Sequence, residues 1–173
     1  MTGCLPADWF AGDVASVARD LIGRWLTVGV DVMALILETE AYGGADDPAS
    51  HAAFRPGGRA AIMAAEAGSV YVYAAYGMYP CFNIVSGATG SASAVLLRAV
   101  CLPGQPQPVN GPGRTSRALG ITLDDHGERL PGDRFAVSAH REPCRIRQTP
   151  RVGISRGVET PWRFVGQPIA GDC

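Results

Sequence analysis

Two glutamates and a tyrosine stand at alternate positions just after a run of apolar residues. The run VMALIL (32–37) is typical of a strand buried on both faces, and it leads directly into ETEAY (38–42). If the strand continues, Glu38, Glu40 and Tyr42 lie on one face of it. A carboxylate at the exit of a buried strand can have a raised pKa, which suits a general base. The alternative is a strand that simply emerges into solvent with a polar face.

The tyrosines are confined to a short part of the chain. The five are Tyr42, Tyr71, Tyr73, Tyr76 and Tyr79. Tyr71 and Tyr73 share a face if residues 69–76 form a strand, whereas Tyr76 can join them only if the chain bends near residues 74–77. Aromatic surfaces can sandwich a flat ligand, and their π faces attract a cation. A tyrosine-rich β-core with its hydroxyls at the rim explains the cluster equally well.

Three further polar residues could serve a site. His51 stands in a loop of small residues, GADDPASHAAF, where backbone can approach a ligand closely, although a lone histidine is more often structural. Asn83 and Arg98 each stand within or beside an apolar strand, where a buried amide or guanidinium needs a partner. Arg98 could pair with Glu38 or Glu40 for structure alone, or it could meet a phosphate or position a water molecule.

The basic residues exclude several kinds of chemistry. All 15 are arginine, so a lysine Schiff base, a lysine general base and a Walker-type phosphate loop are ruled out. The cysteines form no CxxC pair, and the three histidines have no HExxH spacing. We therefore expect no metal and no cofactor.

Charge is unevenly distributed along the chain. The formal net charge is −1, but residues 1–97 carry −5 and residues 98–163 carry +5. A chain divided in this way could present a basic face to nucleic acid. Arginines scattered over a solvated surface explain the same numbers.

The elements that must position these residues are mostly short strands. We expect one domain over residues 1–173, in the cytoplasm and away from membranes. No apolar run is long enough to span a bilayer, and the first residues, MTGCLPADWF, lack the basic region and apolar stretch of a secretory signal. The pattern predicts a loop over 102–113, helices over 13–27, 58–66 and 110–120, and strands over 32–37, 69–76, 81–85, 93–100, 151–155 and 162–166. Strands outnumber helices without βαβ alternation, which predicts an α+β fold: a curved, largely antiparallel, open-barrel-like sheet flanked by short helices.

Several of these motifs, in this order and with these gaps, resemble the alkyladenine (3-methyladenine) DNA glycosylase family. The resemblance covers nearly all of the chain. It is carried by VARDLIGRWL (17–26), LETEAY (37–42), His51, YVYAAYGMYPCFN (71–83), VLLRAV (95–100), NGPGRTSRALGI (110–121), RVGIS (151–155) and PWRF (161–164). It implies a base-excision repair enzyme that flips alkylated purines out of double-stranded DNA and hydrolyses the N-glycosidic bond. A monomer is expected.

The resemblance also assigns roles to residues of the catalytic step. By this resemblance, Glu40 activates the attacking water, and Arg98 lies near that water and the target backbone. Tyr76 corresponds to the wedge that enters the minor groove and fills the gap left by the flipped nucleotide.

Four more residues correspond to the pocket for the flipped base. Tyr42, His51 and Tyr73 correspond to its walls. Asn83 corresponds to the amide that obstructs the exocyclic amine of guanine.

The chain departs from the family pattern in its basic residues. The segment AAEAGSV (64–70) supplies Glu66 where relatives often carry basic residues, so a contact to the duplex is lost or is moved to Arg55 and Arg59. Arg114 replaces a lysine of the family, which keeps the charge but changes its shape. Strand cleavage by glycosylases commonly uses an amine nucleophile, so the missing lysine predicts a monofunctional enzyme without lyase activity.

Two alternatives belong to other functional classes. A catalytically silent binder of damaged nucleic acid needs the same aromatic pocket but no base, and the intact Glu40 argues against it. A metal-dependent hydrolase could use Glu38, Glu40 and His51, but the sequence lacks paired metal ligands.

Overall fold

A long central strand organises the molecule. The structure is a computed structural model that describes residues 3–169. Strand β2 (Val32–Tyr42) has eleven residues, and eight of them in succession are buried. Strand β5 (Ser93–Cys101) pairs with one edge of β2, while β1 (Arg24–Val28) and β9 (Arg163–Pro168) share the other edge. The apolar strand expected over 32–37 therefore continues through ETEAY.

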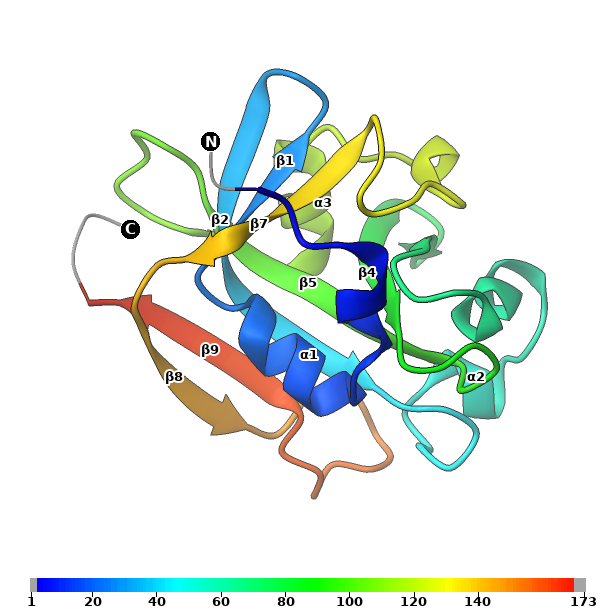
Figure 1. Ribbon diagram of the computed structural model, residues 1–173. Coiled ribbons are helices and arrows are strands. Elements are labelled where there is room, and N and C mark those ends of the chain that lie inside the picture. The colour runs from blue at the N-terminus through cyan, green and yellow to red at the C-terminus, as the bar shows by residue number, and fades with distance from the viewer. Residues whose placement is uncertain (1–2, 170–173) are drawn as a thin grey trace.

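One curved sheet contains all the strands of the described chain. Within residues 3–169, nine strands form the sheet, and six of them follow one another in the order β3-β4-β5-β2-β1-β7. The other three lie beside this path: β6 pairs with β5, β9 pairs with β2, and β8 pairs with β9. Besides β1, β2, β5 and β9, the sheet contains β3 (Val70–Ala75), β4 (Tyr79–Ser86), β6 (Val109–Asn110), β7 (Phe135–Arg141) and β8 (Cys144–Thr149). Every ladder is antiparallel. The sheet bends around the centre of the molecule, with short helices at its faces and ends (Figure 1). The α+β prediction is confirmed.

Helix α1 (Val14–Leu21) begins where the sequence predicts and ends much earlier. The carboxylate of Asp13 accepts a hydrogen bond from the backbone of the first turn and so caps the helix. The helix expected over 13–27 is wrong in its second half. Gly23 adopts a left-handed conformation with φ 84°, and a Cβ there would collide with the carbonyl oxygen of Glu142. The chain turns at this glycine and continues as β1.

The remaining helices are short and lie in the connections. They are η1 (Ala7–Ala11), α2 (His51–Phe54), η2 (Gly58–Ala64), α3 (Pro112–Ala118) and η3 (Leu123–Asp125), where η marks a 3₁₀ helix. The helices expected over 58–66 and 110–120 are therefore present in shorter form. Gly111 precedes α3 with φ 98°, a conformation that favours glycine, and Pro112 then starts the helix.

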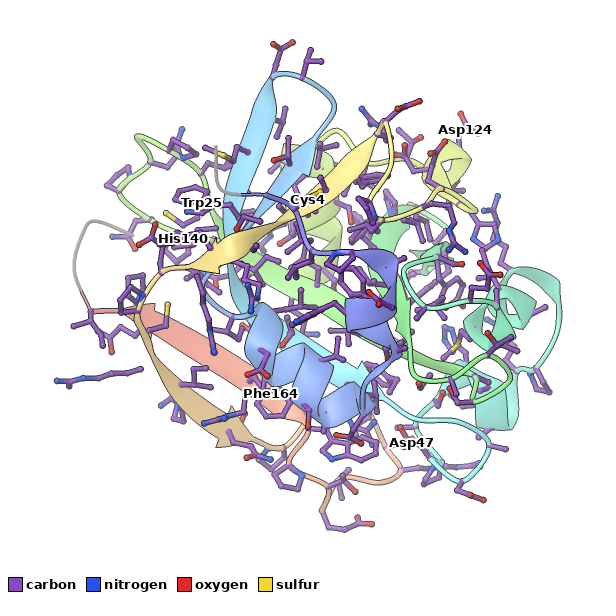
Figure 2. The ribbon with its side chains drawn as sticks, viewed as in Figure 1. Cys4, Trp25, Asp47, Asp124, His140 and Phe164 are labelled. Carbon is purple, nitrogen blue, oxygen red and sulfur yellow. The ribbon has the colours of Figure 1, made fainter. Side chains whose placement is uncertain are left out.

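The main core lies between α1 and the sheet. Helix α1 buries one apolar face against β2 and β5, and Thr39 of β2 donates a hydrogen bond of 2.7 Å to the carbonyl of Ala18 in α1. Phe164 of β9, which is labelled in Figure 2, is also fully buried in this core. Removing such a buried ring typically costs about 3–5 kcal/mol of folding free energy.

Two parts of the C-terminal region differ from the sequence expectation. Residues 151–155, expected as a strand, form an irregular loop, because Pro150 precedes the segment and Gly153 takes a left-handed conformation with φ 73°. Strands β7 and β8 have no counterpart in the sequence prediction. In β8 the side chains facing solvent include Arg145 and Arg147, so no apolar run marks the strand. The strand expected over 162–166 is present as β9.

Candidate active site

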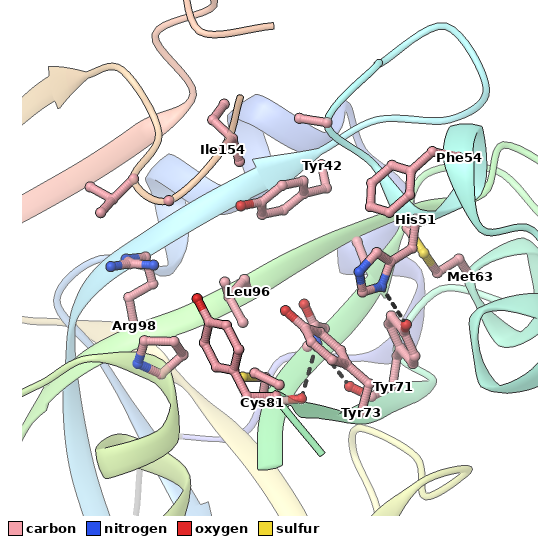
Figure 3. A pocket seen from close by; sticks show the side chains of 18 residues that line it. Tyr42, His51, Phe54, Met63, Tyr71, Tyr73, Cys81, Leu96, Arg98 and Ile154 are labelled. Carbon is pink, nitrogen blue, oxygen red and sulfur yellow. Dashed lines mark hydrogen bonds between the residues drawn. The ribbon is translucent and has the colours of Figure 1, made fainter. Parts of the chain in front are cut away.

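Four of the five tyrosines, together with His51, line a cavity of about 260 Å³. Its lining includes Tyr42, His51, Tyr71, Tyr73, Asn83 and Arg98. Tyr42 and Tyr73 lie on opposite sides of the space, as do His51 and Arg98 (Figure 3). Most ligand sites are concave, largely apolar and furnished with a few fixed polar groups, and this cavity has that character.

Glu40 is fully buried immediately beneath the cavity wall. Its Oε1 accepts a hydrogen bond of 2.7 Å from the backbone N–H of Val152, and its Oε2 accepts one of 2.7 Å from the hydroxyl of Tyr42. Both partners line the cavity. A carboxylate can accept about four hydrogen bonds, so these two leave capacity for a water molecule.

Burial controls the protonation of Glu40. Loss of solvent raises the pKa of this carboxyl above its ordinary value, against the opposing attraction of Arg98 and the hydrogen bonds from Val152 and Tyr42. A carboxylate whose pKa is raised is a stronger base when ionised, so this environment suits proton abstraction from water.

A second glutamate holds two arginines beside Glu40. Oε1 of Glu38 accepts hydrogen bonds of 2.8 Å from Nε of Arg98 and 2.6 Å from Nε of Arg163. Burial raises the pKa of Glu38, but these two hydrogen bonds outweigh burial and bring that pKa below its ordinary value. Nε of Arg98 also lies 3.5 Å from Oε1 of Glu40. Both structural pairings left open for Arg98 therefore exist, and the one with Glu38 is shorter.

An irregularity in the sheet directs Arg98. Glu38 lies opposite Ala99, and Thr39 lies opposite Leu97, so Arg98 is the extra residue of a bulge in β5. Its carbonyl accepts hydrogen bonds from the N–H of Gly111 and from the hydroxyl of Thr115 in α3. Bulges commonly redirect a side chain next to a functional site.

One wall of the cavity is a cluster of rings, in which His51 contacts Tyr71 and Tyr73 edge to face. Nδ1 of His51 lies 2.7 Å from the hydroxyl of Tyr71, and the His51 and Tyr73 ring centres are 4.6 Å apart. Burial, together with the positive charge of Arg55, lowers the pKa of His51 below its ordinary value. The imidazole is therefore neutral at pH 7. Burial raises the pKa of Tyr71 to about 12, so its phenol is also neutral.

Asn83 reaches the cavity from β4 with a fixed amide. Its Nδ2 donates hydrogen bonds of 3.0 Å to the carbonyl of Tyr71 and 3.1 Å to the carbonyl of Cys81. Two carbonyl partners identify this atom as nitrogen, because a carboxamide oxygen cannot donate. The carboxamide oxygen is the part of Asn83 left to meet a ligand.

Tyr76 stands at the tip of the hairpin between β3 and β4. The chain reverses there, as the sequence required for Tyr76 to approach the other tyrosines, and Tyr76 takes a left-handed conformation with φ 51° that is unusual for a bulky residue. Its side chain is 93% exposed, and Tyr76 also lines the cavity mouth. Met78 and Tyr79 beside it are exposed too, at 69% and 42%. The hairpin thus presents an apolar tip to solvent.

The cavity brings together most of the residues that the sequence singled out, with Glu40 beneath its wall, but Glu38 and Tyr79 do not line it. Four residues in its support were not foreseen: Asp47, Arg151, Val152 and Arg163. Val152 acts through its backbone N–H, which no residue pattern reveals. The two arginines could have been suspected, because RVGIS and PWRF place each of them beside apolar residues.

The part of the chain that the structure describes contains neither a metal-binding cluster nor a membrane-spanning helix. Within residues 3–169, no group of three or more His, Cys, Asp or Glu side chains is arranged to hold a metal ion. In the same range, no helix has the length and apolar character needed to cross a membrane.

Comparison with known proteins identifies the family of this chain. The sequence model of the methylpurine-DNA glycosylase (MPG) family matches residues 8–168. A relative from Anaeromyxobacter sp. (strain Fw109-5), named "Putative 3-methyladenine DNA glycosylase", is 44% identical over 92% of this chain and 87% of its own length. Relatives of the same name from Rhodopseudomonas palustris (strain BisB5) and Rickettsia felis (strain ATCC VR-1525 / URRWXCal2) are each 38% identical, over 90% and 93% of this chain and 83% and 92% of their own lengths. The chain belongs to the methylpurine-DNA glycosylase family.

Proposed function

We propose that the protein flips an alkylated purine of the 3-methyladenine type out of double-stranded DNA into the aromatic cavity and hydrolyses its N-glycosidic bond, with water activated by Glu40. The observation that carries this proposal is the buried carboxylate of Glu40 beneath a cavity walled by tyrosine and histidine. A glycosidic bond inside a duplex is inaccessible, so the nucleotide must leave the stack.

The proposed walls favour a damaged base by its charge. Alkylation of a purine ring nitrogen makes the base cationic, and a cation over an aromatic face gains roughly 0.5–2 kcal/mol. Tyr42 and Tyr73 lie on opposite sides of the space, where they can cover both faces of such a base. The neutral imidazole of His51 adds no repulsive charge. The amide of Asn83 excludes guanine by obstructing its exocyclic amine.

Bond cleavage in this proposal needs one carboxylate. A cationic base is a good leaving group and requires little acid assistance. Positive charge then builds on the sugar, where Glu40 stabilises it and accepts the proton of the attacking water. Arg98 positions that water or the adjacent backbone. The chain has no lysine to attack the sugar, so the proposed enzyme is monofunctional and leaves an intact strand at an abasic site.

Exposed groups around the cavity account for DNA binding in the proposal. Tyr76 inserts into the gap left by the flipped nucleotide, and stacking there offsets part of the few kcal/mol that flipping costs. Arg55 and Arg59 are exposed and line a second hollow that shares His51 and Tyr73 with the base cavity. Guanidinium groups in a hollow next to the base cavity can bind the phosphates that flank the lesion.

We propose a monomer that acts in the cytoplasm. A single chain carries each group that the proposed reaction uses, from the general base Glu40 to the wedge Tyr76. The relatives are bacterial, and bacterial DNA lies in the cytoplasm.

The decisive experiment replaces Glu40. Methylated duplex DNA is incubated with excess protein, and the released bases are identified by chromatography. The wild type releases alkylated purines and leaves the strand unbroken at neutral pH. Glu40→Gln releases them at least about 100-fold more slowly, because a general base contributes roughly 10²–10⁴-fold, while binding to the same duplex is retained. Release by Glu40→Gln at the wild-type rate contradicts the role of this carboxylate, and tight binding by a wild type that releases nothing favours a silent binder.

A further inference from the structure

A four-charge cluster lies behind the proposed general base, and Glu38 is at its centre. One oxygen of Glu38 binds Nε of Arg98 and Nε of Arg163, which come from β5 and β9 on the two edges of β2. Glu38 and Glu40 are both buried, and the two arginine side chains are only 14% and 24% exposed. With both carboxylates ionised, the two negative and two positive charges balance.

The geometry leaves Arg98 a choice between the two carboxylates. Its Nε is 2.8 Å from Glu38 but 3.5 Å from Glu40. The hydrogen bond to Glu38 holds the guanidinium by Nε, so the terminal amino groups are not used in that bond, and Arg98 lines the cavity. Without the charge of Glu38, the nearest carboxylate for Arg98 is Glu40.

We propose that Glu38 is a positioning residue for the reaction, because it holds Arg98 at the cavity wall and prevents a closed ion pair between Arg98 and Glu40. This inference rests on the proposed function of Glu40 as the base. A closed pair between Arg98 and Glu40 would occupy the carboxylate that must receive a proton, and it would draw the guanidinium away from the cavity. Glu38 therefore keeps the carboxylate of Glu40 free to accept a proton and keeps Arg98 at the cavity wall.

The charge of Glu38 also acts on the protonation of Glu40. The groups facing Glu40 are the hydroxyl of Tyr42 and the carboxylate of Glu38 on β2, Arg98 on β5, the N–H of Val152 in the loop, Tyr73 on β3, and Arg163 opposite it on β9. The like charge of Glu38 raises the pKa of Glu40, and the charge of Arg98 lowers it. Removing the charge of Glu38 leaves two arginines beside the single carboxylate of Glu40, so the pKa of Glu40 must fall.

The test compares the pH dependence of base release by the wild type, Glu38→Gln and Arg163→Gln under single-turnover conditions on methylated duplex DNA. In Glu38→Gln the charge is lost but an oxygen acceptor of the same size remains. We expect the acidic limb of its profile to move to lower pH by about one unit, the usual size of one neighbouring charge. We expect its plateau rate to fall about tenfold, because Arg98 shifts toward Glu40.

Arg163→Gln provides the opposite change. It removes a positive charge near Glu40 and leaves Arg98 as the only arginine bound to Glu38. The pKa of Glu40 should therefore rise, and the acidic limb should move to higher pH. Glu142→Gln is the matched control, since this carboxylate binds Trp25 and His140 and does not line the cavity, and its profile should equal that of the wild type. Opposite shifts in the two variants cannot arise from a general loss of folded protein.

Each result decides the role of Glu38. An acidic limb that stays in place in folded Glu38→Gln overturns the proposal, as does a rate that falls equally at every pH. If circular dichroism shows that Glu38→Gln is unfolded, Arg163→Gln decides: an acidic limb at higher pH supports the proposal, and an unmoved limb overturns it. A wild type that releases no base contradicts the proposed function itself, whereas release by the wild type with unmoved limbs contradicts only the role of Glu38.

Discussion

The guanidinium carbon of Arg151 lies 4.9 Å from the centre of the Tyr42 ring, and Asp47 holds that guanidinium in place. Arg151 binds the two carboxylate oxygens of Asp47 at 2.6 and 2.9 Å, and its side chain is fully buried. Arg151 does not line the cavity, whereas Tyr42 does. The ring that faces the proposed base is therefore fixed by an ion pair on its other side.

This relationship predicts a large loss of stability when Asp47 is removed. Asp47→Asn leaves the guanidinium of Arg151 buried without its counter-charge, which typically costs about 3–5 kcal/mol. We expect the free energy of unfolding in urea to fall by about 3 kcal/mol. The double variant Asp47→Asn with Arg151→Met should recover part of that loss, because no buried charge remains. A double variant less stable than Asp47→Asn contradicts this account.

The same ion pair predicts how stability changes in acid. Burial raises the pKa of Asp47, but the hydrogen bonds from Arg151 and from two backbone N–H groups outweigh burial. They bring that pKa below its ordinary value of 3.8. A depressed pKa stabilises the fold above the unfolded-state value, and that stability is lost as the pH falls through the folded-state value. We expect the unfolding free energy to drop below about pH 4. The decline should be shallower in the double variant, measured by urea titrations between pH 6 and pH 2.5.

Tyr42→Phe should alter catalysis through Glu40. The Tyr42 hydroxyl donates a hydrogen bond to the Glu40 carboxylate and so lowers the pKa of that carboxyl. Removing this donor raises the pKa, so more of the base is protonated at a given pH. We expect the acidic limb of the base-release profile to move to higher pH, with the aromatic wall intact. Tyr71→Phe is the control, because its hydroxyl binds His51 and leaves the carboxylate untouched. Equal profiles for Tyr42→Phe and the wild type would falsify this link.

The sequence predicted the positions of the reacting groups better than the elements between them. Alternation along a strand placed Glu38, Glu40 and Tyr42 on one face. The hydrogen bond between Tyr42 and Glu40 agrees with this, as does Nε of Arg98, which approaches both Glu38 and Glu40. The spacing of Tyr71 and Tyr73 worked in the same way, since both line the cavity. Side-chain parity depends only on backbone geometry, so it holds wherever the strand is regular and fails at a bulge such as the one at Arg98.

Contacts between distant segments could not be predicted in this way. Val152 donates its N–H to Glu40 across 112 residues of chain, from a segment for which a strand was expected. The bulge that directs Arg98 depends on the register between β2 and β5, which local composition does not encode. The early end of helix α1 at Gly23 depends on a close approach to Glu142. Each of these features is set by tertiary packing.

Tyr76 allows a prediction that separates base flipping from folding. Because Tyr76 is 93% exposed and has φ 51°, Tyr76→Asn should leave stability unchanged or slightly improved, since asparagine tolerates a left-handed backbone. Loss of the ring removes the stacking that offsets unstacking of the target, and one aromatic–base stack is worth roughly 1–3 kcal/mol. We expect base release from duplex DNA to slow by about 10- to 100-fold.

Single-stranded DNA makes this prediction specific to the wedge. In a methylated single strand, the target nucleotide has no complementary strand to leave. The slowing of base release caused by Tyr76→Asn should therefore be smaller on that substrate. Val30→Ala is a suitable control, because Val30 is 94% exposed in the turn between β1 and β2 and does not line the cavity. A defect of equal size on single-stranded and duplex substrates would place Tyr76 in base recognition or chemistry instead. The tip of the hairpin is then part of the pocket, and the energy for flipping must come from the exposed arginines.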